Sequence, residues 1–180
     1  MIIYNKLVFK KFIYNNEIRD KILGLSNKIN NYYKFEDVVI ICVLNGSVVV
    51  LSELLKNLSC NYKVDYVELS SYKGGTKTTG KIDVIKDISI DLKNKNILII
   101  EDIVDTGTTL DFVYKKILKM KPKDIKVFSL LYKESKYKFD IGIDWYGFKI
   151  DDIFTIGYGM DYNFKFRGLK NQRDYHTAFT

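Results

Sequence analysis

Two apolar runs, each followed by a polar turn and then by a helical pattern, constrain the fold more than any other feature. The run VVIICVL covers Val38–Leu44, and ILII covers residues 97–100. Strands in which every residue is apolar are buried on both faces, which is typical of parallel sheets covered by helices. The first run leads into SVVVLSELLKNL, and the second into a segment with Leu110, Val113 and Ile117 on one helical face. The sequence therefore predicts an α/β fold.

The rest of the chain adds strands and helices in alternation. Asn15 is placed to cap a helix in which Ile18, Ile22, Leu25 and Ile29 recur at helical spacing. KVDYVEL, KIDVIKDI and DIKVFSLLYK read as strands, and the helix from about residue 108 to 120 ends before Pro122. The stretch between Leu69 and Ile82 has no aliphatic side chain, which predicts a mobile loop. A mostly parallel central sheet flanked by helices is predicted, with a smaller irregular C-terminal part.

Composition limits the kind of protein this is. With 180 residues and 47% hydrophobic content, the chain suits one domain with one sizeable core. The apolar runs have the length of strands and the first residues lack a secretory pattern, so we expect a cytoplasmic protein. Cys42 and Cys60 lack zinc or redox spacing. The single histidine, His176, lies near the C-terminal end, which argues against catalysis or metal binding that depends on an imidazole.

The formal net charge of +7 admits three kinds of partner: nucleic acid, a membrane surface or a polyanionic small molecule. The lysines are dispersed over several segments, such as KLVFKKF, KMKPKDIK and YKESKYK. Charge alone therefore does not choose between these partners.

A cluster of carboxylates follows the second apolar run. Glu101, Asp102 and Asp105 come after the buried strand, and parallel sheets bind ligands at the carboxyl ends of their strands. The residues TGTT then enter a helix, whose unpaired N–H groups and partial positive charge suit a phosphate. Acids repel a bare phosphate, but they suit sugar hydroxyls, a cationic transition state or Mg²⁺. A ribose phosphate satisfies both parts of the loop.

The segment EDIVDTGTTL, residues 101–110, resembles the phosphoribosyl diphosphate (PRPP) motif of the type I phosphoribosyltransferases, in the form typical of the hypoxanthine-guanine branch. Four further segments resemble that family in the same order. VLNGS looks like its pyrophosphate loop, LSSYKGG its flexible active-site loop, LLYK its purine-binding strand and IFTIGYGMDYNFKFR its C-terminal hood. The resemblance implies one domain over residues 1–180, with a core at about 15–135 and a hood made of about 136–180 and the N-terminal segment.

The reaction that this resemblance implies belongs to purine salvage. It is the Mg²⁺-dependent transfer of the 5-phosphoribosyl group from PRPP to N9 of a 6-oxopurine, hypoxanthine or guanine. The products are a nucleoside monophosphate, IMP or GMP, and pyrophosphate. The C1 carbon would pass through an oxocarbenium-like state, which nearby anions stabilise. The family also implies a homodimer or homotetramer, with no nucleic-acid or membrane partner.

The family pattern also implies a role for each matching residue. Asp105 would be catalytic and handle the proton at N7 of the purine. PRPP and its phosphates would contact Glu101, Asp102, Thr106, Gly107, Thr108, Thr109, Asn45, Gly46 and Arg167. The purine would meet Lys133 at O6, the ring of Phe154, Thr155 and Asp161. Mg²⁺ would be held by Asp161, Glu101 and Asp102, and Ser71 and Tyr72 would close over the site and exclude water.

Three features depart from the family pattern. Asn45 stands where Lys or Arg is usual, although the group there acts largely through its backbone and a cis peptide bond between Leu44 and Asn45 is expected. Phe164 stands where Glu is common, and the tail GLKNQRDYHTAFT is divergent. The first departure bears on pyrophosphate affinity, and the other two bear on the hood and the subunit interface.

Two rival functions remain open from the sequence. A PRPP-binding regulator that contacts nucleic acid would lose the catalytic acids or the flexible loop, whereas this chain keeps Asp105, Lys133 and SSYKGG. An enzyme for another base, such as xanthine, guanine alone or uracil, is the nearer rival. Lys133, Phe154 and Asp161 argue against uracil and adenine, but they do not rank the three oxopurines.

Overall fold

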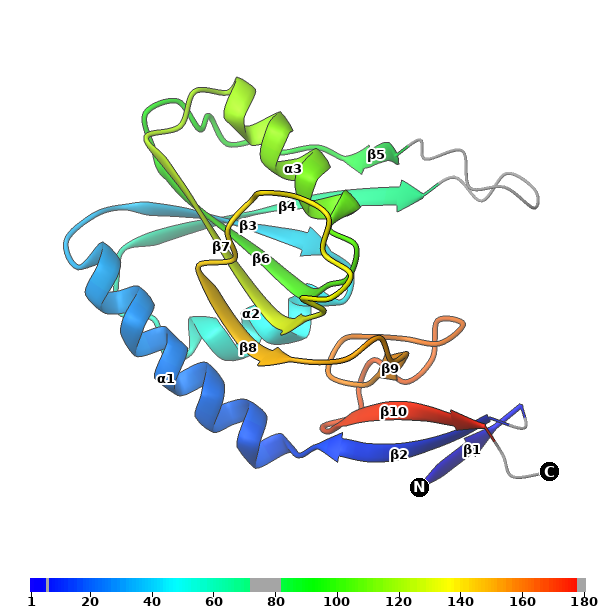
Figure 1. The fold of residues 1–180 in the computed structure, drawn as a ribbon. Coiled ribbons are helices and arrows are strands. Elements are labelled where there is room, and N and C mark those ends of the chain that lie inside the picture. The colour runs from blue at the N-terminus through cyan, green and yellow to red at the C-terminus, as the bar shows by residue number, and fades with distance from the viewer. Residues whose placement is uncertain (6, 72–81, 178–180) are drawn as a thin grey trace.

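The computed structural model describes residues 1–5, 7–71 and 82–177 and contains a larger and a smaller sheet (Figure 1). The larger sheet has six strands in the order β5-β4-β3-β6-β7-β8. They are β3 (Val38–Leu44), β4 (Tyr62–Ser71), β5 (Ile82–Lys86), β6 (Asn96–Val104), β7 (Asp124–Tyr132) and β8 (Trp145–Lys149). All neighbours pair in parallel except β5, which is antiparallel to β4 at one edge. The predicted α/β fold with a mostly parallel sheet is confirmed.

Helices cover both faces of this sheet. They are α1 (Asn15–Tyr33), α2 (Ser47–Leu55) and α3 (Thr108–Lys119). In β3, Ile40 and Cys42 belong to the core that α1 and α2 cover, whereas Val39 and Ile41 belong to the core under α3. This arrangement explains why the whole run is apolar, since each face of the strand is buried by a different layer.

The smaller sheet joins the two ends of the described chain. Its order is β1-β2-β10-β9, with β1 (Ile2–Tyr4), β2 (Leu7–Ile13), β9 (Thr155–Ile156) and β10 (Gln172–Thr177). Strand β2 pairs antiparallel with β10, so segments far apart in the sequence lie side by side beneath the larger sheet in Figure 1. The backbone N–H of Asn15 also donates to Asn171 Oδ1 at 3.0 Å, which ties the start of α1 to this sheet. We call residues 1–13 and 150–177 the hood.

Two predicted boundaries differ from the structure. Tyr14, not Asn15, is the residue before the first turn of α1, and its backbone N–H donates to Glu17 Oε2 at 2.7 Å. Strand β8 lies in the segment that was expected to belong to the hood, yet it pairs with β7 and extends the larger sheet. Its short aromatic sequence, WYGFK, lacks the long apolar run that revealed β3 and β6. The core therefore extends past the predicted limit near residue 135.

Candidate active site

Two pockets open side by side at the carboxyl ends of β3, β6 and β7. One has a volume of about 350 Å³ and lies between the β3–α2 loop and residues 101–110. The other, of about 250 Å³, lies between the ends of β6 and β7 and the hood. Asp102, Ile103 and Asp105 line both pockets. A ligand that fills both would therefore have its junction beside these two carboxylates.

The acidic pair lies inside β6, because the strand continues to Val104 rather than ending at Ile100. The Glu101 side chain is buried, and burial together with the charge of Asp102 raises the pKa of Glu101 well above its usual range. Burial also raises the pKa of Asp102 to about 6, although its Oδ1 accepts a hydrogen bond from the Ile103 N–H at 3.0 Å. Both shifts show that nearby positive charge does not offset the burial of these acids. A bound cation, or positive charge on a substrate, would offset it.

The loop from Thr106 to Thr109 forms one wall of the first pocket. Gly107 has φ +87° and precedes the first turn of α3, where the Asp111 N–H donates to the Gly107 carbonyl. The Tyr137 ring lies so close that a side chain at position 107 would overlap it. The hydroxyls of Thr106 and Thr108 are 3.0 Å apart. Together with the free N–H groups that a helix presents in its first turn, they are donors that could hold an anion.

The β3–α2 loop forms the opposite wall. The peptide bond between Leu44 and Asn45 is cis, as expected. The Asn45 side chain is exposed and donates from Nδ2 to Glu68 Oε1 at 3.3 Å. Gly46 is packed against Asp102 and against the Gly159 carbonyl, so that a Cβ at position 46 would overlap the Asp102 carboxylate. A side chain at position 46 would therefore displace the Asp102 carboxylate. The contact between Gly46 and Gly159 also brings the hood to the wall of the first pocket.

Lys133 is a buried charged residue that lines the second pocket. It follows β7 directly, its N–H donates to the Val104 carbonyl, and its side chain is only 6% exposed. Its Nζ lies 2.9 Å from Asp105 Oδ2 and 3.2 Å from Asp152 Oδ1. A buried ammonium needs such partners, since desolvation of an unpaired charge is costly. A ligand that replaces these contacts must itself offer an acceptor to Lys133.

Residues of the hood line one side of the second pocket. Phe154 is 47% exposed, and its ring lies edge-on to Tyr162 at 5.9 Å between centroids. Thr155 is buried and donates from Oγ1 to Met160 Sδ at 3.1 Å. The half-exposed Phe154 ring thus offers an aromatic face to a planar ligand.

Asp161 and Arg167 form an ion pair at the mouth of this pocket. Arg167 Nη2 lies 2.8 Å from Asp161 Oδ1, and Arg167 Nη1 donates to the Gly159 carbonyl at 2.7 Å. Because Gly159 contacts Gly46, the guanidinium is connected through a single residue to the β3–α2 loop. Arg167 is therefore close to the region where the two pockets meet.

Every predicted site residue whose side chain the structure describes lines one of these two pockets. Asp105 and Asp102 line both. The first pocket also includes Asn45, Gly46, Glu101, Thr106, Gly107, Thr108 and Thr109, and the second also includes Lys133, Phe154, Thr155, Asp161 and Arg167. Ser71 ends β4 and its side chain is not described, while Tyr72 lies outside the described residues.

The family model described as "Phosphoribosyl transferase domain" matches residues 13–163. The chain belongs to this family. It is 38% identical over 141 residues to a hypoxanthine-guanine phosphoribosyltransferase of Staphylococcus epidermidis, which covers 78% of this chain and 79% of the relative. A Staphylococcus aureus relative of the same name is 37% identical over 145 residues, 81% of each chain.

Solved structures support the same assignment for this phosphoribosyltransferase. A hypoxanthine-guanine phosphoribosyltransferase from Bacillus anthracis superposes with a TM-score of 0.87 at 32% identity, covering 95% of this chain and 99% of that one. A hypoxanthine phosphoribosyltransferase from Staphylococcus aureus gives a TM-score of 0.88 at 32% identity, with 96% and 93% covered. The fold is thus shared over nearly the whole length, hood included.

Two charged residues of the phosphoribosyltransferase site were not predicted from the sequence. Lys136 Nζ lies 3.3 Å from Asp105 Oδ1 and 2.9 Å from Asp152 Oδ1. The spacing of Lys133 and Lys136 by three residues, as expected for one turn, was an available signal for the lysine. Asp152 gave no comparable signal, because its partners lie in a different segment of the chain.

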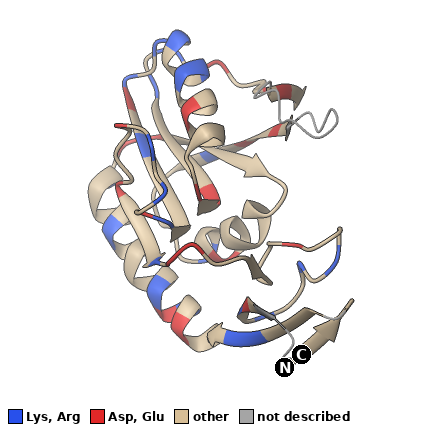
Figure 2. Cartoon of the chain, turned by 45° about the vertical axis from the view of Figure 1, so that its right-hand side comes forward, with Lys and Arg blue, Asp and Glu red and all other residues tan. Residues whose placement is uncertain are grey.

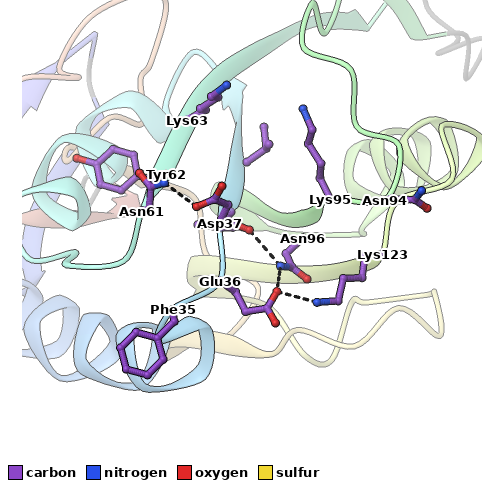
Figure 3. A pocket seen from close by; sticks show the side chains of 12 residues that line it. Phe35, Glu36, Asp37, Asn61, Tyr62, Lys63, Asn94, Lys95, Asn96 and Lys123 are labelled. Carbon is purple, nitrogen blue, oxygen red and sulfur yellow. Dashed lines mark hydrogen bonds and ion pairs between the residues drawn. The ribbon is translucent and has the colours of Figure 1, made fainter.

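A third pocket, of about 580 Å³, lies at the opposite end of the sheet, where β3, β4 and β6 begin (Figure 3). Its acidic side chains already have partners. Glu36 Oε2 accepts from Asn96 Nδ2 at 2.9 Å and lies 2.7 Å from Lys123 Nζ, while Asp37 Oδ1 accepts from Asn61 Nδ2 at 2.6 Å. Parallel sheets bind ligands at the carboxyl ends of their strands, so the pair of pockets at the other end is the candidate active site.

Proposed function

We propose that this protein is a purine-salvage enzyme, a glycosyltransferase that moves the 5-phosphoribosyl group from PRPP to N9 of hypoxanthine or guanine. The products are IMP or GMP, and pyrophosphate. The observation that carries this proposal is the junction of two pockets at Asp102 and Asp105. One pocket offers an anion site, and the other offers a buried lysine and an aromatic ring.

PRPP would occupy the first pocket. Its 5-phosphate would lie on the loop from Thr106 to Thr109, where backbone N–H groups and hydroxyls supply hydrogen-bond donors. Its pyrophosphate would lie toward the β3–α2 loop, near Asn45, Gly46 and Arg167. The planar guanidinium of Arg167 suits phosphate oxygens, which accept two parallel hydrogen bonds from it. Arg167 would exchange its contact with Asp161 for this one.

The reaction would take place beside the acidic pair. The bond between C1 and the pyrophosphate oxygen breaks, the bond between C1 and N9 of the purine forms, and pyrophosphate leaves with its electron pair. Positive charge develops on C1 and the ring oxygen in between. Glu101 and Asp102 face the ribose, and their negative charge stabilises that state more strongly than it stabilises neutral ribose.

The purine would lie in the second pocket against Phe154. The Lys133 ammonium donates to O6, which selects an oxo group over the amino group of adenine. As N9 attacks C1, the proton at N7 passes to Asp105. Asp105 and Lys133 are 2.9 Å apart in the structure, so an oxopurine with O6 and N7 on one edge matches their spacing. Thr155 and Asp161 would border the rest of the base.

The donor set of the site fits Mg²⁺. This ion prefers carboxylate, phosphate and water oxygens and often takes only one or two ligands from the protein. The burial of Glu101 and Asp102 without a compensating cation, together with Asp161 nearby, provides such carboxylates. In the parts of the chain that the structure describes, no three acidic, Cys or His residues converge on one point, so the substrate's phosphates would supply further ligands. Bound Mg²⁺ would neutralise the charge of the departing pyrophosphate.

The expected partners are therefore small molecules: PRPP, the base, the nucleotide and pyrophosphate. Lys and Arg positions are spread over helices, strands and loops and alternate with Asp and Glu in Figure 2, which favours neither nucleic acid nor a membrane surface. None of the described helices combines the length and apolarity that crossing a bilayer requires. A cytoplasmic homodimer or homotetramer is the form that we propose.

The proposal is tested by mixing the protein with PRPP and Mg²⁺ and measuring nucleotide formation separately with hypoxanthine, guanine, xanthine, adenine and uracil. We expect product with hypoxanthine or guanine and none with adenine or uracil. Product with xanthine alone would make it a xanthine-preferring enzyme. PRPP binding without product from any of the five bases would favour a regulatory protein that senses PRPP.

A further inference from the structure

A second lysine reaches the two carboxylates that hold Lys133. Lys133 Nζ lies 2.9 Å from Asp105 Oδ2 and 3.2 Å from Asp152 Oδ1. Lys136 Nζ lies 3.3 Å from Asp105 Oδ1 and 2.9 Å from the same oxygen of Asp152. Two ammonium groups and two carboxylates thus form one closed cluster at the edge of the second pocket.

A turn places the second lysine over the first. The N–H groups of Lys136 and Tyr137 both donate to the Lys133 carbonyl, at 3.0 and 3.2 Å. The turn continues to Lys138, whose N–H donates at 3.3 Å to the carbonyl of Thr106, in the loop from Thr106 to Thr109. Lys136 is therefore held by a backbone segment that is attached at both ends to the site.

The two lysines differ in their surroundings. The Lys133 side chain is 6% exposed, whereas that of Lys136 is 35% exposed and reaches the cluster from the solvent side. Hydrogen bonds to Asp152 and Asp105, and the negative charge of both, raise the pKa of Lys136. Hydrogen bonds from Lys136 and Lys133, and their positive charge, lower the pKa of Asp152. Both shifts agree with an ion pair between Lys136 and Asp152.

Binding of an oxopurine would change the ion pairs within this cluster. If Lys133 turns toward O6, Asp105 and Asp152 lose the ammonium group that now lies between them. Lys136 touches the other oxygen of Asp105 and remains in place. We infer that Lys136 is a positioning residue: it keeps a cation beside Asp105 and fixes that carboxylate toward N7 while Lys133 binds the base. The inference rests on the proposed function, because it needs Asp105 to accept the N7 proton.

The test compares Lys136→Met, Lys136→Arg and the wild type in steady-state kinetics with hypoxanthine and PRPP varied separately. We expect Lys136→Met to lower kcat on the order of tenfold, less than the ~10²-fold or more for losing the acid–base group itself. Its KM for PRPP should stay within about twofold, because the loops that would hold PRPP are left intact. Lys136→Arg should restore most of the activity, since it keeps the charge and the reach.

Lys149→Met is the matched control, because it also removes a surface lysine that pairs with a carboxylate, at 2.7 Å from Glu134 Oε1. It should leave kcat unchanged. An active wild type with an unaffected Lys136→Met would overturn the inference alone, and so would equal losses in kcat and in PRPP affinity that Arg does not restore. A wild type that forms no nucleotide with any oxopurine would overturn the proposed function. Thermal unfolding of each variant separates a loss of catalysis from a loss of fold.

Discussion

Gly159 in the hood lies against Gly46 in the β3–α2 loop, and this close contact predicts that the substitution Gly159→Ala is destabilising. A Cβ at position 159 would lie 2.9 Å from the carbonyl carbon of Gly46 and closer still to its oxygen. The oxygen is the nearer atom and ordinary contacts begin at 3.4 Å, so the loops have to separate by roughly 1 Å or more. Both partners are backbone, and no rotation of a side chain relieves the overlap.

The size of the effect follows from two costs. Gly159 has φ +102°, and a left-handed backbone costs a residue with a Cβ roughly 1–2 kcal/mol. Overpacking adds about 1–3 kcal/mol, while the reduced freedom of the unfolded chain returns about 0.4–1 kcal/mol. We expect the free energy of unfolding to fall by roughly 2–3 kcal/mol, which corresponds to a Tm about 4–12 °C lower. A displacement of about 1 Å costs on the order of 10²-fold in rate, so we expect kcat/KM for PRPP to fall by about that factor.

Gly168→Ala is the matched control, because a Cβ there meets nothing within 4 Å and the residue also lies in the hood. Thermal unfolding and PRPP-dependent kinetics of the two variants are measured together. We expect Gly168→Ala to behave as the wild type. A Gly159→Ala protein with the Tm and kcat/KM of this control would show that the hood and the loop do not need their close contact.

Three further substitutions test the site. Asp105→Asn should lower turnover by about 10²- to 10⁴-fold with little change in PRPP binding, and an unimpaired variant would remove Asp105 from the chemistry. Lys133→Gln should weaken use of the purine far more than use of PRPP, whereas equal losses would mean that the lysine has another role. Asp102→Asn tests the stability of the protein without ligand. Because the pKa of Asp102 is raised to about 6 in the folded state, ionisation of Asp102 lowers the free energy of unfolding as pH rises from about 4 through 6. The variant should lack this pH-dependent loss, so the Tm of the variant relative to that of the wild type should rise over this pH range. A Tm difference that stays constant with pH would contradict the raised pKa.

The sequence predicts those helices and strands whose own residues show a clear hydrophobic pattern. Apolar runs revealed β3 and β6, and helical spacing revealed α1 and α3. The cluster after residue 100 pointed to the acids and to the loop from Thr106 to Thr109, which line the first pocket. Strand β8 was missed because it has only five residues, one of them buried, and carries no long apolar run. The end of β6 was also placed too early, because Glu101 and Asp102 are polar yet lie inside the strand.

The residues alone do not predict pairings between distant segments; only the family resemblance implied that the N-terminal segment joins the hood. Strand β2 finds its partner β10 at the other end of the chain, and neither sequence specifies the other. The same holds for Asp152, which meets Lys133 and Lys136 only after the hood packs against the core. The family resemblance supplied Lys133, Phe154, Asp161 and Arg167, whose individual sequence contexts are those of ordinary surface or core residues.

The pairing of β2 with β10 has a consequence for synthesis of the chain. During translation, β2 has no β10 to pair with until residues 172–177 have been made. Until then β2 presents an unpaired edge, which is a hazard for association with other chains. Lys10 and Lys11, both exposed on this strand, are residues that discourage such pairing. A ribosome-bound chain that stops short of residue 172 would have the strands of its larger sheet but not β10, so the hood would still lack the strand that joins β2 to β9.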